Sequence, residues 1–141
     1  MKKNDPLRLD NQLCFPLYAA SREIIKLYHD PLSKLGLTYT QYITMMVLWE
    51  EKSITVKDLG KRLFLDSGTL TPLLKALEKE GYITRTRSKE DERVLVVELT
   101  EEGKKLKEKA ASVPSEVGKC VKLSAEDAKE LYRILYLLLQ N

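Results

Sequence analysis

Residues 55–81 read TVKDLGKRLFLDSGTLTPLLKALEKEG, and this stretch decides the fold. Thr55 and Asp66 each stand where a helix N-cap is expected, because their side-chain oxygens can accept the free amides of a first helical turn. Apolar residues at helical spacing follow both caps, and Gly81 ends the second run. The stretch therefore predicts a short helix, a turn and a longer helix that begins at Asp66 or Ser67.

The period of the sequence changes after Gly81. Residues 82–87 and 93–99 are rich in β-branched residues or tyrosine, which favours strands. The polar residues 88–92 between them fit the tip of a hairpin. A basic β-hairpin after two helices is typical of a winged helix-turn-helix, and we expect one strand pair in an otherwise helical chain.

Further helices are expected on both sides of this unit. Thr38 and Gln41 match a capping box. Thr100 and Ser124 match the N-caps of two more helices, and Pro114 interrupts the first of these.

The first helix is less sharply bounded. Proline is comfortable only in a first helical turn, so Pro16 places the start of the helix between Asp10 and Pro16. We expect it to run to about Tyr28, with Pro31 ending or restarting it.

These elements predict a mainly α fold with a small β-hairpin wing. A chain of 141 residues, 43% of them hydrophobic, suits a single domain with a real core. We expect that domain to span residues 1–141. The winged helix-turn-helix falls at about 36–102, between dimerisation helices at about 1–35 and 103–141.

The composition limits the class of protein further. No apolar stretch follows the basic residues of the amino terminus, and the apolar runs are too short to span a bilayer. We therefore expect a cytoplasmic protein without a membrane partner. Two cysteines and one histidine are too few to indicate a zinc site, so neither metal nor cofactor is expected. In the cytoplasm such cysteines are free, redox-active or inert.

The predicted helices and hairpin are the parts of a domain that binds double-stranded DNA. A recognition helix enters the major groove with its first residues facing the bases, which here are Ser67, Thr69 and Thr71, and Lys75 follows one turn later toward phosphate. Arginines of a wing can enter the minor groove. The basic residues of the hairpin are Arg85, Arg87, Lys89 and Arg93. The alternative is a solvated charged hairpin, which the acidic Glu90, Asp91 and Glu92 keep open; one of them can also hold Arg93 in an ion pair.

The outer helices carry wide apolar stripes, with Leu9, Leu13 and Leu17 at one end of the chain and residues 131–139 at the other. Such stripes can belong to the core of one chain. They can equally form a homodimer, whose two-fold axis would place two recognition helices on successive major grooves of a pseudo-palindromic operator.

Cys14 is the residue most strongly predicted to react chemically. It lies close to a helix amino terminus, where the dipole favours the thiolate, the reactive form of cysteine. Tyr18 is one turn further on, and Tyr28 and Tyr39 follow. The alternative is inert packing, because free cysteine is among the most buried residue types.

Five stretches carry a family resemblance: Leu13-Cys14-Phe15, YAASR at 18–22, GLTYTQY at 36–42, LWE at 48–50 and LDSGTLTPLL at 65–74. Together they resemble the MarR family of dimeric winged-helix regulators, and in particular its organic hydroperoxide sensors, the OhrR group. The resemblance covers nearly the whole chain, most strongly residues 12–103. It implies a repressor that leaves its operator when an organic hydroperoxide oxidises the cysteine matching Cys14.

The resemblance also implies roles for single residues. Tyrosines matching Tyr28 and Tyr39 hydrogen-bond the thiol from the partner subunit, and one matching Tyr18 lies nearby. Asp91 and Arg93 match the aspartate and arginine of the wing. Members with two cysteines carry the second where Cys120 stands, and join the two as a disulfide between subunits.

Several alternatives stay open. Cys120 is either this resolving thiol or an incidental surface cysteine, in which case a small cellular thiol would react with oxidised Cys14. A regulator of the same fold could respond to electrophiles or small aromatic ligands. A thiol peroxidase would need a regenerating partner, and no Cys-x-x-Cys or cysteine–histidine arrangement is visible. A protein-interaction module would leave the basic wing unused, so we expect a regulator and not an enzyme.

Overall fold

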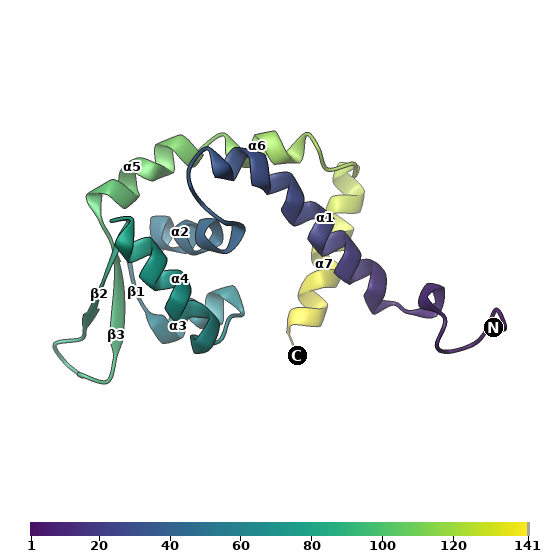
Figure 1. The fold of residues 1–141 in the computed structure, drawn as a ribbon, viewed down its shortest axis with the longest axis horizontal. Helices are drawn as coiled ribbons and strands as arrows, with labels where there is room; N and C mark the ends of the chain where they lie inside the picture. The colour runs from purple at the N-terminus through teal and green to yellow at the C-terminus, as the bar shows by residue number, and fades with distance from the viewer. Residues whose placement is uncertain (141) are drawn as a thin grey trace.

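The computed structural model describes residues 1–140; Asn141, the last residue of the predicted carboxy-terminal dimerisation segment, lies outside the described residues. The fold is mainly helical with one small sheet, as predicted (Figure 1). In chain order the elements are η1 (Leu9–Asn11), α1 (Cys14–Ser33), α2 (Tyr39–Glu51), β1 (Ser53–Thr55), α3 (Val56–Leu63), α4 (Ser67–Lys79), β2 (Ile83–Arg87), β3 (Leu95–Leu99), α5 (Glu101–Ala110), α6 (Val113–Gly118) and α7 (Ala125–Leu139).

Side-chain caps set the starts of five helices, and all five predicted caps are confirmed: Thr38, Thr55, Asp66, Thr100 and Ser124. The capping box at α2 is complete, since the Thr38 hydroxyl accepts the Gln41 amide at 3.2 Å and the Gln41 side chain accepts the Thr38 amide at 3.0 Å. Each cap satisfies an amide that the first helical turn leaves free.

The predicted end of the first helix near Tyr28 is wrong. Helix α1 continues across Pro31 to Ser33. A proline so close to the end of a helix removes only one backbone hydrogen bond, and Leu32, 1% exposed, anchors the last turn in the core. The turn is completed by Gly36, whose positive φ of 68° suits glycine.

Helix α4 also contains a proline. It runs without interruption from its Asp66 cap across Pro72 to Lys79. The Thr71 hydroxyl donates to the Ser67 carbonyl one turn back at 2.8 Å, whereas the carbonyl that loses its amide donor at Pro72 is that of Gly68.

The prediction of a single strand pair is incomplete. The described residues form a three-stranded antiparallel sheet in the order β1-β3-β2, with Thr55 opposite Val96 and Arg85 opposite Val97. Strand β1 has three residues, too few to show a period of two, and its pairing with β3 joins residues far apart in the sequence. Beyond β1, strands β2 and β3 extend alone as the wing (Figure 1).

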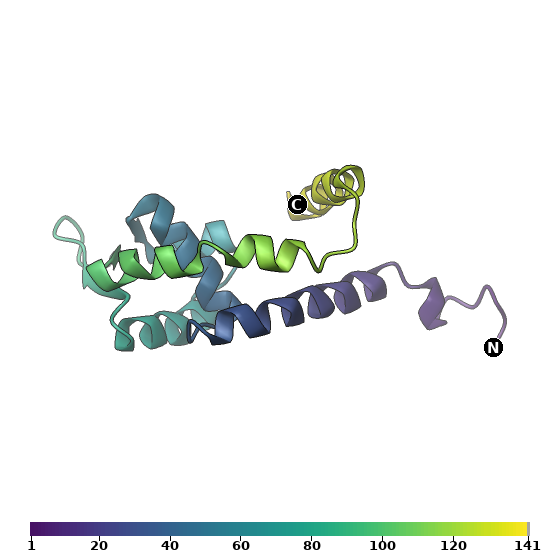
Figure 2. The same ribbon diagram turned by 90° about the horizontal axis from the view of Figure 1, so that it is seen from above.

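The core fills the lobe formed by α2, α3, α4 and the sheet. Its fully buried side chains include Met45, Leu48, Leu59, Leu70, Leu74, Leu77, Ile83 and Val97. Helices α1 and α6 extend away from this lobe, and α7 stands apart from the rest of the chain (Figures 1 and 2). Within α7 (Ala125–Leu139) no residue is buried. None of the helices in residues 1–140 is both long enough and apolar enough to cross a membrane.

Candidate DNA interface and thiol site

The amino end of α4 presents a row of polar side chains to solvent. Ser67, Thr69, Thr71 and Lys75 are all exposed, as a recognition helix requires. The preceding Asp66 carboxylate accepts the Thr69 amide at 2.8 Å, and hydrogen bonds from Thr69 hold the pKa of Asp66 below its ordinary value. The first turn of α4 is therefore fixed by the protein itself.

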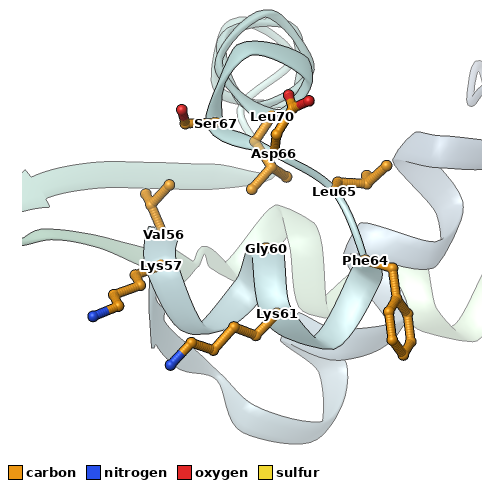
Figure 3. A pocket seen from close by; sticks show the side chains of 9 residues that line it. All are labelled: Val56, Lys57, Gly60, Lys61, Phe64, Leu65, Asp66, Ser67 and Leu70. Carbon is orange, nitrogen blue, oxygen red and sulfur yellow. The ribbon is translucent and has the colours of Figure 1, made fainter. Parts of the chain in front are cut away.

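Helix α3 adds two lysines that the sequence analysis did not single out. Lys57 and Lys61 line an open hollow of about 730 Å³ between α3 and α4, together with Ser67 at the start of α4 (Figure 3). The same two lysines line a second hollow that reaches Arg93 of the wing. Their four-residue spacing on an exposed helix face was the available signal.

The wing carries one preformed ion pair at its tip. The Asp91 carboxylate accepts the Arg93 backbone amide at 3.0 Å and its guanidinium at 3.2 Å, and these bonds lower the pKa of Asp91. The Arg93 side chain is nonetheless 91% exposed. Arg87 and Lys89 are exposed as well, so the hairpin presents three basic side chains to solvent.

Arg85 is placed differently from the other wing residues. Its guanidinium donates to Glu78 of α4 at 3.1 Å, and its side chain is only 18% exposed. The alternation of β2 explains this position: Arg85 shares its strand face with the buried Ile83, two residues before it.

Cys14 is the first residue of α1, and its side chain is exposed. Tyr18, one turn later and 58% exposed, accepts a hydrogen bond from Arg22 at 3.2 Å. Inert packing of Cys14 inside its own chain is therefore excluded.

Tyr28 and Tyr39 pack against each other, with ring centroids 4.8 Å apart. Both line a hollow of about 420 Å³ whose apolar wall includes Leu32 and Leu37. Burial, with a smaller contribution from Tyr28, raises the pKa of Tyr39, so its phenol stays protonated and able to donate.

One chain does not bring Cys14 to these tyrosines. Cys14 and Tyr28 are fourteen residues apart on α1, which at 1.5 Å per residue separates them by about 21 Å along the helix axis. A contact between them therefore requires a second molecule.

Cys120 lies two residues after the end of α6 and is exposed. Its thiol donates weakly to the Glu116 carbonyl at 3.7 Å. Both cysteines are free thiols in this structure.

A family model described as "Transcriptional regulator SarA/Rot" matches residues 26–110, which include α2, α3, α4 and the wing. The chain belongs to this family of transcriptional regulators. The regulator is also 52% identical to the organic hydroperoxide resistance transcriptional regulator of Bacillus subtilis over 139 residues, which are 99% of this chain and 95% of that protein.

The regulator also matches AbfR of Staphylococcus epidermidis in several solved states. It superposes on reduced AbfR bound to DNA with a TM-score of 0.80 at 36% identity, covering 99% of this chain and 95% of the other. For overoxidised AbfR bound to DNA the TM-score is 0.79 at 36% identity, covering 99% and 98%. For disulfide-formed AbfR the TM-score is 0.67 at 37% identity, and the match covers 97% of this chain and 96% of the other.

These matches confirm the resemblance to MarR-type regulators and to the organic hydroperoxide group within them. They also confirm a mainly helical winged-helix fold. The protein is a transcriptional regulator and not a thiol peroxidase.

Proposed function

We propose that this protein is a dimeric repressor that binds a pseudo-palindromic DNA operator and releases it when an organic hydroperoxide oxidises Cys14. The observation that carries the proposal is the exposed thiol at the start of α1, in a chain half identical to an organic hydroperoxide resistance regulator. A solvent-exposed cysteine at a helix amino terminus is where a peroxide can meet a thiolate.

The DNA-binding surface is the face that joins α4 to the wing. Ser67, Thr69 and Thr71 would meet base edges or phosphates in the major groove, with Lys75 on phosphate. Arg87 and Arg93 would reach the minor groove, with Asp91 orienting Arg93. Lys57 and Lys61 lie between these two contacts and would bind the phosphates in between.

The dimer is supported by the apolar surface that one chain leaves uncovered. Leu13 is 87% exposed, and Leu131, Leu137 and Leu138 on α7 are between 45% and 54% exposed. Large apolar side chains exposed in this number usually mark an interaction site. A symmetric dimer through α1, α7 and the amino-terminal segment would cover it.

The same dimer would complete the thiol site. Cys14 of one subunit would enter the hollow beside the partner subunit's Tyr28 and Tyr39, while Tyr18 lies one turn from Cys14 on the same helix. Protonated phenols donate hydrogen bonds that favour the thiolate. The apolar wall of the hollow suits the carbon chain of an organic hydroperoxide.

The oxidation can be written as two steps. The Cys14 thiolate attacks one peroxide oxygen, the O–O bond breaks, and the alkoxide leaves as the alcohol after protonation, so Cys14 becomes a sulfenic acid. The Cys120 thiol of the other subunit then attacks the sulfenic sulfur, water leaves, and an intersubunit disulfide forms. The better match to DNA-bound AbfR than to disulfide-formed AbfR supports a change of shape in the second step.

The test is operator binding measured by fluorescence anisotropy before and after cumene hydroperoxide. The wild type should bind when reduced and dissociate when oxidised, with a covalent dimer on a non-reducing gel. Cys14→Ser should bind equally well and stay bound. Release of DNA by the Cys14→Ser protein would refute the proposal.

A further inference from the structure

We propose that Glu78 and Arg85 form a clamp that sets the position of the wing relative to the recognition helix. Operator affinity then depends on Glu78, although a carboxylate has the wrong charge to attract DNA. This inference rests on the DNA-binding role proposed above and makes Arg85 a positioning residue, not a DNA contact.

A single carboxylate holds both the side chain and the backbone of the wing strand. Glu78 lies in the last turns of α4, and its Oε1 accepts the Arg85 guanidinium at 3.1 Å. Its Oε2 accepts the Arg85 backbone amide at 3.0 Å. The guanidinium also lowers the pKa of Glu78, so the carboxylate is ionised at neutral pH. Two bonds from one group fix the direction of the strand as well as its distance from α4.

Arg85 cannot serve this clamp and contact DNA at the same time. Its side chain is 18% exposed, against 91% for Arg93 at the tip of the wing. It stands opposite the fully buried Val97, on the inner face of the sheet. Its Nε is buried and has no hydrogen-bond partner among the described residues. A guanidinium held in this way is a structural link between two elements.

The clamp acts close to the end of the three-stranded part of the sheet, one residue before the last pair between β1 and β3. The base of the hairpin is already fixed, because Gly81 makes the turn after α4 and its carbonyl accepts the Thr100 hydroxyl at 2.6 Å. Strand β1 pairs with β3 only as far as Val96. Glu78 therefore holds β2 beyond the turn, and a small tilt at this point would move the tip that carries Arg93.

Removal of Glu78 gives a test in which two effects have opposite signs. Simple electrostatics predicts that Glu78→Ala binds DNA more tightly, because a negative charge is lost near phosphate. The clamp predicts weaker binding, by roughly tenfold, as expected for the loss of a hydrogen bond to a charged group. The matched control is Glu80→Ala, which removes an exposed carboxylate two residues away and should bind as well as the wild type or better.

A second readout separates positioning from general loss of stability. The slope of log affinity against log salt should fall in magnitude by about one for Arg93→Gln, because one positive charge close to the DNA is lost. It should fall by part of that amount for Glu78→Ala and Arg85→Gln, because the displaced tip keeps only part of the Arg93 contact, whereas a general loss of stability would leave the slope unchanged. Arg93→Gln should also cost less affinity in the Glu78→Ala background than in the wild type, because a displaced tip has less contact to lose.

The outcomes are distinct. If the reduced wild type fails to bind any candidate operator, the proposed function and the clamp both fall. If the wild type binds, and Glu78→Ala binds as tightly as Glu80→Ala, the clamp alone is overturned. Circular dichroism checks folding, and if Glu78→Ala does not fold, Glu78→Gln is measured in its place with the same criteria.

Discussion

At the scale of the residue, the Tyr39 hydroxyl is the group most directly tied to thiol reactivity. Burial keeps it protonated, and it lines the hollow proposed for the partner subunit's Cys14. Tyr39→Phe should slow oxidation of Cys14 roughly tenfold, because a hydrogen bond to the thiolate is lost. A dimedone-based probe of sulfenic acid measures the rate.

Tyr42→Phe is the control for this change. Tyr42 belongs to the same aromatic cluster, with its ring 5.8 Å from that of Tyr28, but it is 3% exposed and lies outside the lining of the hollow. It should react at the rate of the wild type. Equal slowing in both variants would mean that packing of the cluster, and not the Tyr39 donor, governs the thiol.

Asp66 gives a prediction about pH. Its pKa is lowered in the folded state by the hydrogen bonds from Thr69, so the ionised cap stabilises the fold above the unfolded-state pKa of about 4. That contribution is lost as the pH falls through the lowered folded-state value. Asn is an equally good cap that does not titrate. The Tm difference between wild type and Asp66→Asn should therefore be constant from pH 7 to 5 and shift against the wild type below about pH 4.

At the scale of the element, the packing of α5 against the sheet depends on Gly103, because this position has no room for a side chain. A Cβ on Gly103 would lie 2.3 Å from the Tyr82 carbonyl oxygen and 2.6 Å from Leu99. Gly103→Ala should therefore destabilise the protein by about 2 kcal/mol and lower the Tm by roughly 6 °C. Gly118→Ala is the control, because a Cβ there meets nothing within 4 Å. It should be neutral or slightly stabilising, and a similar loss in both would contradict the steric explanation.

Helix starts were predictable from the sequence because a cap is a local event. Thr38 and Asp66 bind amides three residues away, and nothing distant can change that signal. Strand β1 was missed because only its pairing with β3 defines it. The end of α1 was misplaced because Leu32 packs in the core and holds the turn despite Pro31. Tertiary contacts therefore decided β1 and the end of α1, whereas local contacts decided the helix starts.

Helix α7 is the element whose apolar face a single chain leaves uncovered. Leu138 is 54% exposed, near the carboxy-terminal end of the apolar stripe of α7. Leu138→Glu should shift the protein toward monomer in analytical ultracentrifugation, since burial of a charge in the dimer interface is costly. Lys129→Glu, on the opposite face of α7, should leave the dimer intact. Dimers of normal stability in both variants would place the interface elsewhere.

At the scale of the whole molecule, the thiol site could not be derived from the fold of one chain. The sequence predicted a reactive cysteine with three tyrosines near it, but the length of α1 keeps Cys14 about 21 Å from Tyr28 along the helix. Only the family resemblance placed them together across subunits. The position of Arg85 was missed for a related reason: its inward face is set by the register of β2 against β3 and by Glu78.

The proposed switch also predicts which oxidised form of the dimer releases DNA. A sulfenic acid adds one oxygen to Cys14, whereas a disulfide requires the two Cα atoms to come within about 7 Å and would pull α1 toward the segment after α6 of the partner. This chain matches overoxidised, DNA-bound AbfR almost as well as the reduced form, and disulfide-formed AbfR less well.

In buffer free of other thiols, Cys120→Ser treated with cumene hydroperoxide should therefore carry an oxidised Cys14, form no covalent dimer and keep its operator. Mass spectrometry and anisotropy on one sample measure both states, with Cys14→Ser as the unoxidised control. If Cys120→Ser released DNA as fully as the wild type, oxidation of Cys14 alone would be the switch and Cys120 an incidental surface thiol.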